Sequence, residues 1–147
     1  MTLIKDEATA KLDAVGRAGM EAIGLFEDLA ERLEEPALRE TVASHAAAQR
    51  YLLERTADVR RARGELPQAS DPERPHLEAA GAVVRAALLR GDANEHYVES
   101  LLDAAARVGE AVEAALDSRE LPAEIRALLE AFKRDHDAFR HTLRSRA

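Results

Sequence analysis

Apolar residues recur at steps of four and three along most of this chain, and that spacing limits its fold more than any other feature. Such a spacing places apolar side chains along one face of an α-helix. No stretch shows the sustained alternation of a β-strand, and β-branched residues are few. Alanine, which has the highest helix propensity, is the most frequent residue. The chain is therefore predicted to be all-α. The first series is Ile4, Ala8, Leu12, Val15, Gly19, Ala22, Phe26, Leu29 and Leu33.

Prolines and glycines divide these series into helices. Pro36 and Pro122 each stand where a new series begins, and proline suits the first turn of a helix. Gly64 follows the second series, where glycine commonly ends a helix. We predict one domain over residues 1–147, an antiparallel four-helix bundle with a crossover loop and a short extra helix before the third long helix. The predicted helices cover about residues 3–34, 36–63, 76–90, 93–117 and 122–144.

The composition narrows the classes of function. Hydrophobic residues make up 46% and charged residues 33%, which fits a folded soluble domain. A net charge of −7 repels phosphate, so nucleic acid is not expected as a partner. The absence of cysteine excludes disulfides and thiolate metal sites. The charged N-terminus lacks the apolar run of a signal peptide, and no span of ~20 apolar residues is present. We expect a cytoplasmic protein without a membrane span.

Two histidines occupy positions in these apolar series where leucine would be usual. His45 lies in the series of the second helix, and His136 lies in that of the last helix. If the helices pair antiparallel about the turns near residues 35 and 120, His45 faces the level of Ala22–Phe26. His136 then faces the level of Ala104–Ala105. An imidazole that points into a bundle is a metal ligand, a proton switch or a hydrogen-bonded core residue.

A metal site on His45 and His136 is one interpretation. Carboxylate-bridged metal pairs in helix bundles use Glu-x-x-His, because residues three apart share a helix face. Here Val42 and Lys133 stand where those glutamates would be. A two-iron site is therefore poorly supported, whereas a simpler zinc or iron site with flanking carboxylates stays open. In the core interpretation, Gln49 joins a hydrogen-bonded network with His45.

Three stretches resemble a family of small bacterial ferritin-like four-helix-bundle proteins of unknown function. They are Ala30-Glu-Arg-Leu-Glu-Glu-Pro-Ala-Leu38, Ala57-Asp-Val-Arg-Arg-Ala-Arg-Gly-Glu-Leu-Pro67, and Glu120-Leu-Pro-Ala-Glu-Ile-Arg-Ala-Leu-Leu129 with His136-Asp137. The resemblance covers most of residues 20–145. The chain departs from the family pattern in the first helix, at Glu21–Phe26. It also departs in the third long helix, where Gly109-Glu110 is displaced by about one turn. The resemblance implies a ferritin-like fold and no established activity.

These observations favour a non-enzymatic soluble helical protein that acts through self-association or protein–protein contact. A homo-oligomer is one form this function would take. The alternative is a degenerate ferritin-like metal-binding protein that uses His45 and His136. A third interpretation, a bundle that binds a lipid or another small molecule, requires a sizeable cavity.

Overall fold

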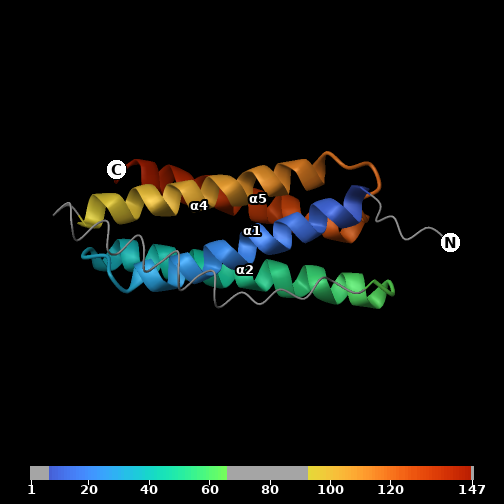
Figure 1. The fold of residues 1–147 in the computed structure, drawn as a ribbon, viewed down its shortest axis with the longest axis horizontal. Coiled ribbons are helices and arrows are strands. Elements are labelled where there is room, and N and C mark those ends of the chain that lie inside the picture. The colour runs from blue at the N-terminus through green and yellow to red at the C-terminus, as the bar shows by residue number, and fades with distance from the viewer. Residues whose placement is uncertain (1–6, 66–92, 147) are drawn as a thin grey trace.

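The computed structural model describes residues 7–65 and 93–146, and these residues form four α-helices and no strand (Figure 1). The helices are α1 (Glu7–Ala30), α2 (Pro36–Ala62), α4 (Ala93–Leu116) and α5 (Ala123–Arg144). The prediction of an all-α chain with four long helices is therefore confirmed for this part of the chain. None of the described helices has the length and hydropathy needed to cross a membrane.

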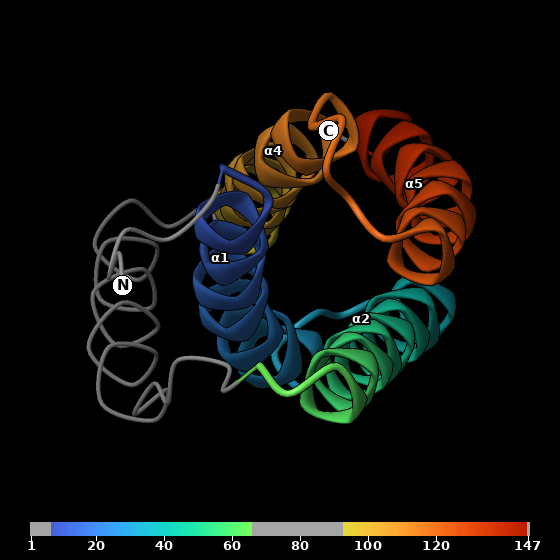
Figure 2. The same cartoon turned by 90° about the vertical axis from the view of Figure 1, so that its right-hand side faces the viewer.

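The four helices surround a common core. α1 packs against α2 and α4, and α5 packs against the same two helices, so α1 and α5 lie on a diagonal. Figure 2 shows this arrangement from the end of the bundle. In Figure 1 the chain runs from right to left along α1 and α5, and from left to right along α2 and α4. α2 therefore ends at one end of the bundle, and α4 begins at the other.

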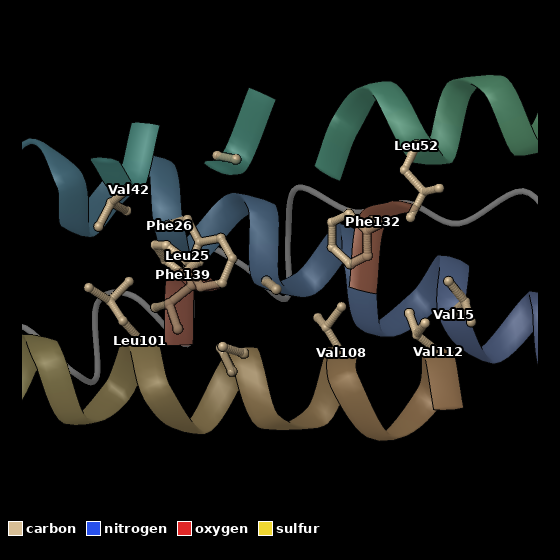
Figure 3. Close-up of a cluster of buried hydrophobic side chains, with 14 of the residues drawn as sticks. Val15, Leu25, Phe26, Val42, Leu52, Leu101, Val108, Val112, Phe132 and Phe139 are labelled. Atoms are coloured by element: carbon tan, nitrogen blue, oxygen red, sulfur yellow. The ribbon is translucent and has the colours of Figure 1, made fainter. Parts of the chain in front are cut away.

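The residues of the predicted apolar series form the core. Every residue of each series that lies within the described helices is buried, including the two histidines. Figure 3 shows part of this core, with Phe26, Phe132 and Phe139 directed between the helices. Burial of such side chains removes apolar area from water and is the main favourable contribution to folding. The spacing of four and three thus predicted the inward face of each helix correctly.

The first helix ends earlier than predicted. We expected it to continue to about residue 34, but α1 ends at Ala30. The backbone N–H of Arg32 bonds to the carbonyl of Leu29, and that of Leu33 bonds to Ala30. These bonds reach back three residues and close a tighter turn. Pro36 disfavours a helical conformation at Glu35, which is extended. The chain must therefore leave the helix before Glu35.

The bounds of α2 and α5 and the end of α4 agree with the predictions to within one residue. The predicted start of the first helix, near residue 3, lies outside the described residues. α2 ends at Ala62, and Gly64 has a φ of 81°, the left-handed conformation that favours glycine. α5 begins at Ala123 with Pro122 as its N-cap residue, one position later than predicted. Such differences are usual at helix ends. The predicted crossover loop and the predicted helix at 76–90 lie outside the described residues.

Candidate functional site

The two inward histidines meet in the core between α2 and α5. The Nε2 atom of His45 lies 2.8 Å from the Nδ1 atom of His136. The other nitrogen of His136, Nε2, lies 2.7 Å from the carbonyl oxygen of Ala105 in α4. The imidazole of His45 also lies against Phe26 of α1, so the site joins all four helices. Both levels predicted from the hairpin turns are therefore confirmed.

The carbonyl of Ala105 decides which ring nitrogens carry hydrogen. A carbonyl oxygen only accepts hydrogen bonds, so the Nε2–H of His136 donates to it. In a neutral imidazole the other nitrogen is then an acceptor. Nδ1 of His136 therefore accepts from the Nε2–H of His45. It follows that both neutral rings carry their hydrogen on Nε2, and that Nδ1 of His45 has a free lone pair.

Phenylalanine rings enclose the two imidazoles. Phe139 stacks on His45 with a centroid distance of 3.9 Å and an interplanar angle of 13°. Phe132 stacks on both imidazoles, with centroid distances of 5.6 Å to His45 and 5.1 Å to His136. Phe26 contributes from α1 at 6.0 Å from His45. These are all three phenylalanines of the chain, so its largest apolar rings are concentrated around its buried imidazoles.

This apolar enclosure keeps the two rings neutral. His45 is 6% exposed and His136 is 1% exposed. Burial, together with the positive charge that His136 would carry, lowers the pKa of His45 to about 3. Burial is also the main cause that lowers the pKa of His136. The carbonyl of Ala105 opposes this effect, Arg140 adds to it, and Asp137 opposes it. At neutral pH the pair is therefore an uncharged hydrogen-bonded unit.

Gly109 of α4 lies beside this unit. A Cβ atom at Gly109 would lie 3.7 Å from Cδ2 and 3.8 Å from Nε2 of His136, and 3.3 Å from Nη1 of Arg140. The distances to His136 are ordinary contact distances, and the Arg140 atom is the end of a flexible side chain, so the imidazole does not require a glycine at this position. We did not predict Ala105 or Gly109 as part of the site. The sequence offered one indication of Ala105: antiparallel pairing about the turn near residue 120 places it at the level of His136.

Gln49 lies outside the histidine pair, contrary to the network proposed for it. Its side-chain N–H donates to the carbonyl of Gly19 in α1 at 2.7 Å. One turn of helix separates Gln49 from His45, but this distance along α2 directs the amide toward α1 while the imidazole faces α5. Gln49 thus joins α1 to α2, as the histidines join α2 to α5 and α4.

A buried ion pair lies further along the same side of α2. Nη1 of Arg60 lies 3.0 Å from Oδ1 of Asp13 in α1, and both side chains are about 95% buried. Nε of Arg60 contacts Glu65 at 3.3 Å. A buried charge without a partner is strongly unfavourable, so removal of either member destabilises the fold. This pair adds a second polar link between α1 and α2.

The donor set of the histidine pair does not fit a metal ion as it stands. Two imidazole nitrogens on one tetrahedral zinc are about 3.4 Å apart, given bonds of about 2.1 Å. Here the two nitrogens are 2.8 Å apart and share a hydrogen. In residues 7–65 and 93–146, no three His, Cys, Asp or Glu side chains are grouped to hold a metal. The flanking acids Glu21, Glu27, Glu31, Glu99 and Asp103 are exposed.

Comparisons of the chain with protein-family models, with curated proteins and with solved structures found no match. A function is therefore inferred from the residues of this protein and their geometry.

Proposed function

We propose that this protein is a non-enzymatic, ferritin-like antiparallel helical bundle that acts by self-association through the exposed face of α2. The observation that carries the proposal is the exposure of Tyr51, which is 60% accessible to solvent. It is the one large hydrophobic residue exposed on the described surface. Tyrosine is enriched at protein interfaces, where its ring supplies apolar area and its hydroxyl a hydrogen bond.

Tyr51 borders a groove between α1 and α2 with a volume of about 420 Å³. Alanines line much of this groove: Ala30, Ala43, Ala46 and Ala47. Their small side chains allow another helix to approach closely. Arg50 of α2 forms an ion pair with Glu27 of α1 at the rim of the groove. The surface thus combines an exposed aromatic residue, small apolar side chains and a charged pair, as protein interfaces do.

The exposed face of α2 is complementary to itself when two copies are antiparallel. If a two-fold axis crosses α2 at the level of residue 45, each residue of one α2 faces a residue of the partner's α2, and the two residue numbers sum to 90. Ala43 then faces Ala47 of the partner subunit. Glu40 faces the partner's Arg50, and Arg39 faces the partner's Tyr51. These residues lie within about one third of the helix circumference, at a spacing of 100° per residue. The register therefore places opposite charges and small residues together.

Sedimentation velocity at rising protein concentration tests the proposal. The wild-type protein is expected to dimerise, and Tyr51→Glu is expected to raise the dimer dissociation constant by about tenfold or more. Ala131→Glu is the matched control, because it places the same charge at an exposed position of α5. A wild-type protein that remains monomeric at millimolar concentration would overturn the proposal.

Charge reversal tests the register. Glu40→Arg and Arg50→Glu are each expected to weaken the dimer, because each places like charges together. The double variant restores opposite charges in both symmetric pairs and is expected to dimerise more tightly than either single variant. Equal weakening in the double variant would contradict the antiparallel register.

The second candidate is a ferritin-like metal-binding protein that uses His45 and His136. The observation in its favour is that the structure brings both imidazoles into direct contact. A metal would have to replace the shared hydrogen and separate the nitrogens. Metal content measured by mass spectrometry, on protein purified without a nickel column, separates the two candidates. Stoichiometric metal that is lost in His45→Gln with His136→Gln would favour this second function.

A further inference from the structure

A second groove lies between α2 and α5, above the histidine pair. It is an open groove with a volume of about 600 Å³. The charged side chains that line it are carboxylates, from Glu40 of α2 and Asp135 of α5. Thr41, Ser44 and Thr142 supply hydroxyl groups, and Phe139 adds an apolar surface. His45 lines the groove from within the core.

The threonines of this groove present acceptors. The hydroxyl of Thr41 donates to the carbonyl of Ala37, and that of Thr142 donates to the carbonyl of Ala138. Each hydroxyl hydrogen is therefore engaged by its own helix, whereas the oxygen lone pairs remain available. The ionised carboxylates of Glu40 and Asp135 only accept.

His45 presents an acceptor as well. Its Nε2–H is donated to His136, because the Ala105 carbonyl fixes the direction of the chain of hydrogen bonds. Nδ1 of His45 is then a lone-pair acceptor, and no group within residues 7–65 and 93–146 donates a hydrogen bond to it. His45 is only 6% exposed, yet it borders the groove. Nδ1 is not among the fully enclosed polar atoms that lack a partner, so solvent reaches it and a water or a ligand can supply the donor.

We propose that the groove between α2 and α5 binds an organic cation with ammonium groups, whose N–H donors satisfy His45 Nδ1 and the carboxylate of Asp135. Donors on the ligand match the acceptors of the groove, and its positive charge matches the two carboxylates. A bare metal ion fits less well. His45, Glu40 and Asp135 all line the groove, yet no three such groups among the described residues are close enough to hold one metal. An extended ligand can reach separated acceptors.

Isothermal titration calorimetry with 1,4-diaminobutane is the direct test. Binding is expected, and Asp135→Asn is expected to weaken it by about threefold, as for one exposed ion pair. Asp137→Asn is the matched control: it removes the same charge from the same helix at an exposed position that does not line the groove. Equal weakening by both variants would overturn the assigned site.

Tetramethylammonium separates hydrogen bonding from charge, because it is a cation without N–H donors. It is expected to bind at least about tenfold more weakly than the diamine, the loss that one charged hydrogen bond implies. Equal binding of the two cations would overturn the proposal. Zinc that binds in this groove more tightly than the diamine would overturn it too.

His45→Gln tests the buried acceptor. Glutamine keeps an N–H near the position of Nε2, so the bond to His136 can persist, but it has no acceptor in place of Nδ1. The variant is expected to bind the diamine about tenfold more weakly. Nitrogen NMR of labelled wild-type imidazoles supplies a readout that does not depend on a variant. A hydrogen found on Nδ1 of His45 would overturn the proposal. Glu40 belongs both to this groove and to the proposed dimer contact, whereas Asp135 and His45 line the groove alone. Asp135→Asn and His45→Gln are therefore expected to weaken diamine binding without weakening dimer formation.

Discussion

Acidification from pH 8 to pH 5 is expected to destabilise this protein through its buried imidazoles. In the unfolded chain a histidine titrates near its ordinary pKa of about 6.5. In the folded protein, burial lowers the pKa of His45 to about 3, and burial lowers the pKa of His136 as well. Below pH 6.5 the unfolded chain therefore binds more protons than the folded one. The contribution of these neutral imidazoles to the free energy of unfolding is fully present above pH 6.5 and is lost as the pH falls toward 3.

The magnitude follows from the shift. Each pH unit in this range costs about 1.4 kcal/mol for one proton bound only by the unfolded chain. Between pH 6.5 and pH 5, His45 alone therefore lowers the free energy of unfolding by about 2 kcal/mol. His136 acts in the same direction. A domain of this size has a total stability of about 5–15 kcal/mol, so the loss is a large fraction of it.

Urea unfolding followed by circular dichroism at pH 8, 6.5 and 5 measures this loss. His45→Gln removes one titrating group and is expected to reduce the loss by about 2 kcal/mol. His141→Gln removes an exposed imidazole from the same helix as His136 and is expected to leave the loss unchanged. The window stops at pH 5 because free carboxyl groups titrate near pH 4. The reasoning fails if His45→Gln and the wild-type protein lose the same stability.

Two further comparisons test the packing. Gly16→Ala is expected to raise the free energy of unfolding by about 0.5–1 kcal/mol, because a Cβ there meets no atom within 4 Å. Gly19→Ala is expected to be the less stable of the two, since its Cβ would lie 3.0 Å from Cδ1 of Leu53; the reverse order in urea midpoints would refute this. Arg60→Met removes the guanidinium that pairs with the buried carboxylate of Asp13 and is expected to cost about 3–5 kcal/mol. Arg61→Met, at the exposed neighbour, is expected to stay within about 0.5 kcal/mol, and similar thermal shifts in both variants would contradict a structural role for the buried pair.

The helices and their inward faces could be predicted because both follow from local periodicity. Steps of four and three place residues on one face whatever the rest of the chain does. The short turns at Pro36 and Pro122 then require neighbouring helices to return alongside each other. That was enough to predict that His45 lies at the level of Phe26 and His136 at that of Ala105.

The hydrogen bonds of the site could not be predicted in the same way. They depend on how far each helix is rotated about its axis, and a shift of a few tenths of an ångström makes or breaks them. Gln49 illustrates this, because it shares the inward face with His45 yet bonds to Gly19 of α1. Gly109 does so too, since its contact with the His136 ring follows from the packing of α4 on α5 and not from local spacing.

The amino-acid sequence by itself determined an all-α chain, the inward faces of its helices and the burial of two histidines, because these depend on spacing and hydrophobicity alone. The tertiary structure decided that the two imidazoles bond to each other, that the Ala105 carbonyl orients both, and that His45 borders a groove lined by acceptors. The reason is physical: a hydrogen bond between distant residues exists only when packing places a donor within about 3 Å of an acceptor.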